Sequence, residues 1–523
     1  MQNYKILWAD DEIDLLRGHI LFLEGKGFTI TPVNNGTEAV ERCAREHFDL
    51  VFLDEHMPGL SGLDALVQIK GARPNLPVIM ITKNEEEQIM NEAIGARIDA
   101  YLIKPLNPQQ ILPAVKKILE NRQLVVDHIN TAYQQEFGRI GEAISGNPGH
   151  RKWAEIYRKL VNWELQMDSA DNSAMAEVLH TQQVEANSNF WKYVDANYVK
   201  WLNDPKSDRP MLSHQLMGQK IFPHVGKGAP VFMFLIDNLR LDQWKVLEPV
   251  LSSMFVVREE DLYYSILPTA TAYSRNAIFS GLLPTQMART HPDLWVGEDE
   301  DEGKNRYERE FLQKQIERAK LDIRFSYHKI RQLHEGKELV EGFNNLWSND
   351  LNVIVYNFVD MLSHARTDME MIRELAADER AYRSLTRSWF EHSPLLDMLR
   401  LVATRKAHVV ITTDHGMVRV NRPTKIRGER DINSNLRYKH GRNLGFEQEK
   451  DKDKLIFVRD PDRYFLPRLQ VTTSYVFATE DRFFAYPTNY NHYVKMYEGT
   501  FQHGGVSLEE MIIPVVTLSP KNV

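Results

Sequence analysis

Apolar runs and amphipathic stretches alternate along the first part of the chain. Strand-like runs occur at KILWA, FTITPV, DLVFLD, PVIMIT and AYLIKP, and amphipathic stretches lie between them. Strands that alternate with helices predict a parallel, doubly wound sheet, which places its sites at the carboxyl ends of the strands. We therefore expect an α/β domain with a five-stranded parallel sheet over residues 1–120.

The middle of the chain, residues 121–225, has a helical pattern instead. The stretch from Arg151 to Asn203 contains no glycine and no proline. Large apolar side chains recur in it at helical spacing. They are Trp153, Tyr157, Leu160 and Trp163, followed by Trp191, Val194, Tyr198 and Trp201. We interpret this stripe as the core of a helical bundle that joins two larger parts, with a ligand-binding box as the alternative.

Strand-like runs return in residues 226–523. PVFMFLID, NVIVYNFVD and HVVITTD are nearly continuous apolar runs, and each ends in an aspartate. Such runs are typical of strands that are buried on both faces of a sheet. We therefore expect a second α/β domain here. The highly charged stretch from Gly297 to Gly342 is predicted to be an insertion on its surface.

Composition narrows the setting of these domains. The chain has 523 residues, of which 43% are hydrophobic and 26% are charged, as in soluble globular proteins. No apolar run reaches the roughly 18 residues that a membrane-spanning helix needs, so no membrane insertion is predicted. The single cysteine, Cys43, cannot form an internal disulfide and suits the reducing cytoplasm. A net charge of −8 argues against a general nucleic-acid coat.

Polar residues follow four of the predicted strands in the N-terminal domain. They are Asp10, Asp11, Asp54, Thr82 and Lys104. In a parallel sheet these side chains all fall at the carboxyl edge. Three carboxylates at such an edge can bind a hard cation such as Mg²⁺. The cation and Lys104 would neutralise a phosphoryl group on Asp54, and Thr82 could donate a hydrogen bond to it.

In this order, the Asp pair, DEHMPGLSG from Asp54 to Gly62, the threonine and the Lys-Pro pair resemble the response-regulator receiver domain. The resemblance implies a flavodoxin-like fold that a sensor histidine kinase phosphorylates on Asp54. It implies a phosphorylation-dependent homodimer as well. It also implies Mg²⁺ binding by Asp10, Asp11, Asp54 and the carbonyl of His56, and a switch made of Thr82, Tyr101 and Lys104.

Two residues depart from the receiver pattern. Lys83 stands where small residues are common, and could change access to the phosphoryl group. Pro113 falls in the last predicted helix and is expected to kink or shorten it.

Residues of metal-ligand type occur at the ends of the C-terminal strands, where no helix-turn-helix is evident. They are Asp237, Asp360, His364, Asp414, His415 and His503. Such a set can hold two divalent metals if water or substrate completes each shell. Mixed imidazole and carboxylate ligands favour zinc, with manganese as the alternative. Thr269 and Thr271 lie in the loop after the first strand, and a threonine hydroxyl beside a metal could attack phosphorus.

The order LID, PTAT, DMLSH, TDHG and HGG resembles the alkaline phosphatase superfamily, in particular its PglZ-type branch. The resemblance implies one metal site of Asp237, Thr271, Asp414 and His415, and a second of Asp360, His364 and His503. It also implies that Thr271 is the nucleophile, with Thr269 as the less favoured candidate. A threonine nucleophile is more usual in the phosphodiesterase-like members than in the mutases, which favours zinc and a phosphodiester substrate.

A basic segment follows the TDHG motif. Its eight cations are Arg419, Arg422, Lys425, Arg427, Arg430, Arg437, Lys439 and Arg442, and only Glu429 and Asp431 oppose them. Such a flank could hold further phosphates of a nucleotide or oligonucleotide, although it is equally typical of a solvated charged loop. Asn276, His440 and Arg442 are weaker candidates for substrate contacts.

Together, the three parts resemble the response regulators of the type IX secretion system. We expect a zinc phosphodiesterase that acts on linear or cyclic oligonucleotides and is controlled through Asp54. A second hypothesis is a protein-binding regulator with a structural metal site, whose partner is a sigma factor or a secretion component. A third and weaker hypothesis is direct promoter binding, which the acidic balance opposes.

Overall fold

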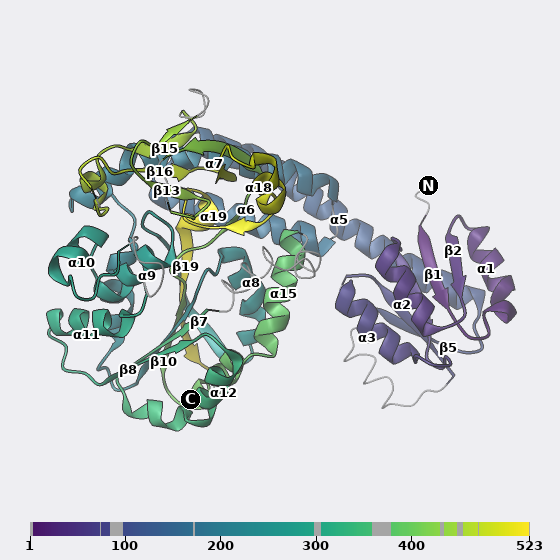
Figure 1. Ribbon diagram of the computed structural model, residues 1–523. Coiled ribbons are helices and arrows are strands. Elements are labelled where there is room, and N and C mark those ends of the chain that lie inside the picture. Colours follow the sequence, from purple (N-terminus) through teal and green to yellow (C-terminus); the bar gives the residue numbers. More distant parts are fainter. Residues whose placement is uncertain are drawn as a thin grey trace. The chain divides into compact units, whose positions relative to one another are not determined.

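The computed structural model describes residues 4–73, 75–83, 98–170, 173–297, 305–357, 378–428, 433–446, 453–468 and 470–521. The chain forms two compact units (Figure 1). The first contains the chain up to Phe137 together with Glu164–Glu177, and the second contains Gly138–Trp163 and Val178–Val523. None of the helices in the described ranges combines the length and the apolar character that a membrane crossing needs.

Five parallel strands in the order β2-β1-β3-β4-β5 form the sheet of the first unit. They are β1 (Lys5–Ala9), β2 (Thr29–Val33), β3 (Leu50–Asp54), β4 (Val78–Thr82) and β5 (Ala100–Ile103). Buried side chains of α2 (Gly36–Arg45) and α3 (Gly62–Ala72) belong to one core cluster. Those of α1 (Arg17–Glu24) and of the first part of α5 (Pro108–Ser145), up to Leu119, belong to the other. Helices therefore cover both faces, and the predicted doubly wound sheet is confirmed.

Three long helices make up the linker region. α5 is a continuous helix of 38 residues that runs across the predicted boundary at residue 120. Pro113 lies inside α5 but does not end it, because a proline in the second turn removes only the hydrogen bond to the carbonyl of Gln109. α6 (His150–Ala170) and α7 (Ser173–Asn203) follow. The predicted apolar stripes of these two helices are almost entirely buried, which confirms their role in a core.

A six-stranded sheet in the order β7-β19-β10-β6-β9-β8 is the centre of the second unit. Its strands are β6 (Val231–Ile236), β7 (Phe255–Tyr264), β8 (Phe325–Ile330), β9 (Leu351–Tyr356), β10 (His408–Thr412) and β19 (Ile512–Pro520). β10, β6, β9 and β8 are parallel, whereas β19 is antiparallel to both β10 and β7. Every residue of β6 and β9 is buried, as the continuous apolar runs predicted.

Helices flank this sheet on both sides. Figure 1 shows α9 (Thr271–Ser280), α10 (Pro284–Thr290) and α11 (Glu308–Arg318) on one side, and α8 (Leu241–Leu251) and α15 (Glu379–Glu391) on the other. α12 (Leu333–Glu341) and α16 (Pro394–Val402) pack against each other.

Smaller sheets lie between β10 and β19 in the sequence. β11 (Val418–Arg419) pairs with β18 (Phe501–Gln502). A second small sheet has the order β14-β12-β17, and a third has the order β13-β16-β15. Their strands are β12 (Arg422–Arg427), β13 (Tyr438–Gly441), β14 (Gly445–Phe446), β15 (Leu455–Val458), β16 (Ser474–Ala478) and β17 (Arg482–Ala485). α18 (Tyr490–Tyr497) and α19 (Leu508–Met511) complete this region.

The prediction of a surface insertion between Gly297 and Gly342 is wrong. β8, in the middle of this stretch, pairs along its whole length with β9 as an edge strand of the central sheet. Glu308, at the start of α11, is 1% exposed, and Lys329 of β8 lies 3.1 Å from its carboxylate. The charged residues misled the prediction because several of them neutralise one another inside the domain instead of facing water.

Candidate functional site

The acidic edge of the first unit has the geometry of a phosphoryl-accepting site. Oxygen atoms of Asp10, Asp11 and Asp54 lie within 4.8 Å of one another. Lys104 Nζ is 2.7 Å from Asp54 Oδ1 and 2.9 Å from Asp10 Oδ2. β1, β3 and β5 bring these side chains together because their carboxyl ends meet at one edge of the parallel sheet. The carboxylates can bind a divalent cation, and Lys104 can bind the arriving phosphoryl group.

Electrostatics at this edge reflect burial. Burial raises the pKa of Asp54, helped by the nearby Asp10 carboxylate and opposed by Lys104. Burial alone would lower the pKa of Lys104, but its hydrogen bonds to Asp54 and Asp10 raise it. The backbone N–H of His56 donates to Asp54 Oδ2 over 3.2 Å. A cation at the three carboxylates would relieve the repulsion between Asp10 and Asp54.

The remaining predicted switch residues surround this cluster. The Thr82 hydroxyl donates to the carboxylate of Glu55, a buried residue next to Asp54 that sequence reasoning did not single out. Tyr101 is partly buried and packs against the core cluster of α2 and α3. The unusual Lys83 lies on the surface with its Nζ 3.4 Å from Glu12.

A second acidic cluster lies at the carboxyl edge of the central sheet in the second unit. Asp237 follows β6 and Asp414 follows β10, and these two strands are parallel neighbours. Ligand atoms of Asp237, Asp414 and His415 lie within 4.8 Å of one another. All three side chains are fully buried. The predicted placement of both aspartates at one sheet edge is thus confirmed, while their role as metal ligands stays a prediction.

Thr271 is the first residue of α9 and faces this cluster. Its Oγ1 is 3.0 Å from His415 Nε2 and 3.5 Å from Asp237 Oδ1. The N-terminus of a helix carries free N–H groups and a partial positive charge, which favour an anionic ligand such as a phosphate. The hydroxyl predicted to be the nucleophile therefore lies beside the candidate metal ligands and at the anion-binding end of a helix.

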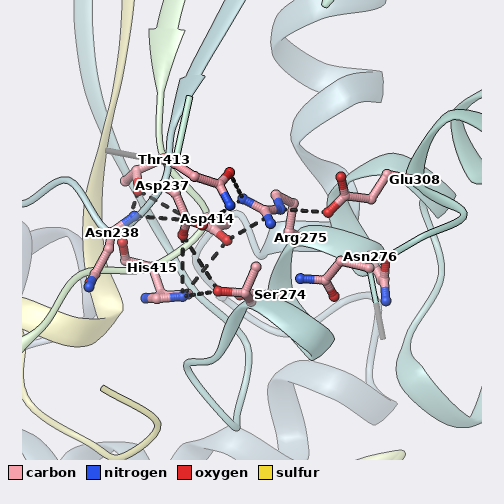
Figure 2. A network of polar contacts seen from close by, with 12 residues as sticks. Asp237, Asn238, Ser274, Arg275, Asn276, Glu308, Thr413, Asp414 and His415 are labelled. Atoms are coloured by element: carbon pink, nitrogen blue, oxygen red, sulfur yellow. Dashed lines mark hydrogen bonds and ion pairs between the residues drawn. The ribbon is translucent and has the colours of Figure 1, made fainter. Parts of the chain in front are cut away.

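A buried arginine that sequence reasoning missed lies between the carboxylates (Figure 2). Arg275 Nη1 is 2.7 Å from Asp237 Oδ2, and Arg275 Nε is 2.6 Å from Glu308 Oε1. Arg275 and Glu308 are each 1% exposed. Arg275 lies one helical turn after Thr271 on α9. This spacing from the candidate nucleophile was the feature of the sequence that could have pointed to Arg275. By occupying Oδ2, Arg275 leaves the Oδ1 oxygen of Asp237 directed at Thr271 and His415.

The pKa values of the Asp237 and Asp414 carboxyl groups shift in opposite directions. Burial acts to raise the pKa of Asp237, but Arg275 and the two nearby histidines, His415 and His503, lower it below the usual value. Burial and the adjacent Asp237 carboxylate raise the pKa of Asp414. Asp414 Oδ2 is buried and accepts no hydrogen bond from the described residues. A buried oxygen without a hydrogen-bond donor is unfavourable, and a cation bound beside the His415 imidazole would compensate its charge.

His503 lies beside the same cluster, although it is far from the other members in the sequence. Its ring stacks on that of His415 with centroids 4.3 Å apart. Its Nδ1 lies 3.2 Å from the carbonyl of Thr269, so Nδ1 carries the proton, and the Nε2 atom is of the type that ligates a metal. Thr269 is fully buried, and its hydroxyl donates to the carbonyl of Gly505 and accepts from the N–H of Gly504. Thr269 thus holds the two loops together, which favours Thr271 as the nucleophile.

Other predicted residues have mixed positions. Asp360 and His364 lie outside the described residues. Asn276 is buried, and its amide group donates to the carbonyl of Ala272 within α9. His440 is also buried, with its ring 5.3 Å from that of Tyr475, whereas Arg442 is partly exposed. Their contacts with a substrate stay predictions.

The basic segment is not a continuous cationic surface in the described part of the chain. Arg437 is fully buried and forms a bidentate ion pair with Glu510. Arg422 pairs with Glu480 and Asp481. Lys439 is buried, and burial lowers its pKa to about 7. These members therefore have partners within the protein, and the Arg437–Glu510 pair joins the start of β13 to α19.

Comparison with known proteins identifies the domains. Residues 216–518, more than half of the chain, match the family described as "BREX system PglZ alkaline phosphatase-like domain". The chain belongs to the PglZ family. Residues 6–116 match the "Response regulator receiver domain", and residues 123–202 match the "PorX response regulator linker domain". The protein is therefore a two-component response regulator that carries an alkaline phosphatase-like domain.

Curated relatives match over part of the chain. The transcriptional regulatory protein ResD of Bacillus subtilis (strain 168) is 34% identical over 115 residues, which cover 22% of this chain and 48% of ResD. The regulatory protein AlgB of Pseudomonas aeruginosa is 27% identical over 231 residues, or 43% of this chain and 48% of AlgB. The chain spans about a quarter to a half of the length of the curated relatives it matches.

Solved receiver structures are also similar. A CheY-like receiver domain from Methanospirillum hungatei JF-1 is 27% identical and covers 23% of this chain and 96% of its own, with a TM-score of 0.23.

Proposed function

We propose that this PglZ-family response regulator is a two-metal phosphodiesterase that acts on linear or cyclic oligonucleotides and is controlled by phosphorylation of Asp54. The observation that carries the proposal is the placement of Thr271 against Asp237, Asp414 and His415. A helix N-terminus, a hydroxyl and three buried ligand-type side chains converge there. This combination suits nucleophilic attack on a phosphate ester.

The residues present fit zinc. The cluster mixes imidazole with carboxylate, and the buried Asp414 Oδ2 lacks a hydrogen-bond donor among the described residues. Asp237, Asp414, His415 and Thr271 would hold one ion. His503 would hold the other, with Asp360 and His364 as its expected companions. When bound, the ions supply Lewis-acid stabilisation of the attacking and leaving oxygens of phosphoryl transfer, and manganese is the alternative.

The chain's own groups would perform the remaining tasks. The Thr271 oxygen would bond to phosphorus as the ester oxygen of the leaving group departs. Water would then cleave the phosphothreonine ester and restore the hydroxyl. Arg275 would hold Asp237 in a fixed orientation through its 2.7 Å contact. The first N–H groups of α9 would bind the non-bridging oxygens of the phosphate.

Control would come from the receiver. A sensor histidine kinase would phosphorylate Asp54, with Mg²⁺ held by Asp10, Asp11, Asp54 and the His56 carbonyl. Thr82, Tyr101 and Lys104 would respond to the phosphoryl group and favour a receiver homodimer. The match of residues 123–202 to the PorX linker supports a role in regulating type IX protein secretion. A sigma factor or a secretion component is the expected further partner.

A turnover assay tests the catalytic part of this proposal. Purified full-length protein, loaded with zinc, is given bis(p-nitrophenyl) phosphate and a linear and a cyclic dinucleotide. Hydrolysis that Thr271→Ala abolishes and a chelator removes is the expected result. Thr290→Ala, which changes an exposed threonine on α10, is the matched control. If zinc-loaded protein leaves all three substrates intact, the domain is not a phosphodiesterase of this kind and a protein-binding output becomes the better account.

A further inference from the structure

One face of linker helix α7 is built into the catalytic unit. Asn187, Trp191 and Tyr198 follow one another at spacings of 4 and 7 residues, which places them on the same side of a helix. Their exposed fractions are only 7%, 8% and 1%. Each side chain makes a polar contact with a segment of the second unit. The helix that matches the linker family is therefore also part of the enzyme's structure.

The loop that leads into the nucleophile rests on Tyr198. This loop, residues 266–271, is called the nucleophile loop below. The backbone N–H of Leu267 donates to the Tyr198 hydroxyl over 2.7 Å. Leu267 precedes Thr271 by four residues, and Tyr198 is itself fixed against the ring of Tyr464. A displacement of Tyr198 would therefore be felt at the start of α9.

The segment after His503 rests on Asn187. This segment, residues 503–509, is called the His503 loop below. Asn187 Oδ1 accepts the backbone N–H of Leu508 over 2.8 Å, and Asn187 Nδ2 lies 3.2 and 3.1 Å from the two carboxylate oxygens of Glu509. Trp191 adds a hydrogen bond to Glu480, whose backbone N–H donates to the carbonyl of Val506. One side of α7 therefore holds the His503 loop at two points.

The two loops are also joined to each other. The Thr269 hydroxyl bonds to Gly505 and Gly504 at 2.8 and 3.1 Å, and His503 Nδ1 meets the Thr269 carbonyl. α7 therefore contacts both loops, and the two loops contact each other, so that the three segments form a closed network of hydrogen bonds. A network of this kind fixes the separation of its members more firmly than a single contact would.

We propose that Asn187 and Tyr198 are positioning residues of the catalytic site, and that linker helix α7 sets the place of His503 relative to Thr271. This inference deepens the proposed function, on which its turnover prediction rests. It makes the linker an input to catalysis, because any change in the position of α7 acts on both loops at once. Neither residue touches the reacting atoms, so their effect is on geometry.

The experiment compares four full-length variants. Asn187→Ala and Tyr198→Phe remove the two supports. Asn189→Ala changes an asparagine of the same helix whose amide donates to the helical carbonyl of Glu185, and Tyr193→Phe changes a tyrosine that lies by the backbone of His150 instead. Hydrogen exchange of zinc-free protein should become about tenfold faster in the His503 loop of Asn187→Ala and in the nucleophile loop of Tyr198→Phe, the effect of losing a buried hydrogen bond. The two controls should match the wild type.

Metal binding and turnover supply further readouts. Zinc competition with a chelator should show that one of the two ions binds about 10–100-fold more weakly in Asn187→Ala. kcat should fall about tenfold or more with KM little changed, since only the alignment of groups is altered. The pair Asn187→Asp with Glu509→Gln exchanges donor and acceptor across the contact, and should recover most of the loss that Asn187→Asp alone produces.

Each outcome decides between the readings. Unchanged exchange in both loops overturns the inference, whatever the turnover. Faster exchange with wild-type zinc affinity also overturns it, because the loops then do not set the position of His503. An equal loss in Asn189→Ala shows a general weakening of α7 and overturns it too. If the wild type binds zinc but cleaves no phosphodiester, while exchange and zinc affinity change as expected, the proposed function fails and the inference stands.

Discussion

Arg275→Met is the most informative single change in the second unit. It removes the guanidinium that lies 2.7 Å from Asp237 and 2.6 Å from Glu308, while methionine keeps much of the volume. Both carboxylates are almost completely buried, so water cannot replace the lost charge. Glu308 keeps Lys329 as a partner at 3.1 Å. Among the described residues, Asp237 loses the strongest of the cations that lower its pKa.

The expected magnitude follows from that difference. Removing one partner of a buried ion pair costs about 3–5 kcal/mol, because the other charge stays buried without compensation. Since Glu308 retains Lys329, we count one uncompensated carboxylate and not two. For a unit of this size, each kcal/mol lowers the melting temperature by about 2 °C, so we expect a decrease of about 6–10 °C.

The assay is thermal unfolding of full-length protein, with the transition of the second unit followed in the absence and presence of zinc. Zinc should narrow the gap between variant and wild type, because a divalent cation neutralises the same carboxylate. Arg289→Met, at an exposed position of α10, should change the unfolding free energy by less than about 0.5 kcal/mol. If zinc-free Arg275→Met melts within about 2 °C of the wild type, Asp237 does not depend on Arg275 and the reasoning is refuted.

Three further predictions concern other residues. Thr271→Ala should abolish turnover but leave the melting temperature near that of the wild type. Thr269→Val should destabilise the second unit by about 1–3 kcal/mol, because it leaves two backbone groups of the His503 loop without partners. Thermal unfolding and a turnover assay measure both effects. Burial raises the pKa of Glu509 to about 7, so its contribution to stability is present at low pH and is lost as the pH rises through about 7. Glu509→Gln should therefore match the wild type near pH 5 and melt higher near pH 8, and equal pH profiles would contradict this. Lys104→Met and Asp54→Asn should each prevent the dimer that beryllofluoride induces in the wild type, which light scattering can follow, and a dimer in both variants would exclude Asp54 as the acceptor.

The sequence was most informative where a residue's position follows from strand ends. Asp54, Asp237 and Asp414 each follow a continuous apolar run, and parallel strands bring such residues to one edge. Both acidic clusters were therefore predictable without knowledge of any side-chain contact.

The sequence was least informative about buried charge. Arg275 and Glu308 are residue types that usually occur on a solvated helix surface. Only the fold shows that they neutralise each other beside Asp237. Arg437 was grouped with a basic flank for the same reason, although Glu510 lies against it. Pairs that are distant in the sequence leave no periodic signal, so hydrophobic patterning cannot reveal them. The prediction of a surface insertion from Gly297 to Gly342 was wrong for the same reason.

The position of β19 has a consequence for how the second unit folds. β19 lies between β7 and β10, yet it is synthesised after every other strand of the central sheet. Among the strands that the structure describes, β19 is the partner of the ten-residue strand β7 in that sheet, so β7 stays unpaired there until β19 inserts. Within the sheet, β7, which precedes Thr271, is therefore connected to the strands that end at Asp237 and Asp414 through β19, a pairing between segments far apart in the sequence. A nascent chain that has completed its receiver would still lack the finished central sheet of the second unit, so the two acidic sites of the protein would form at different times.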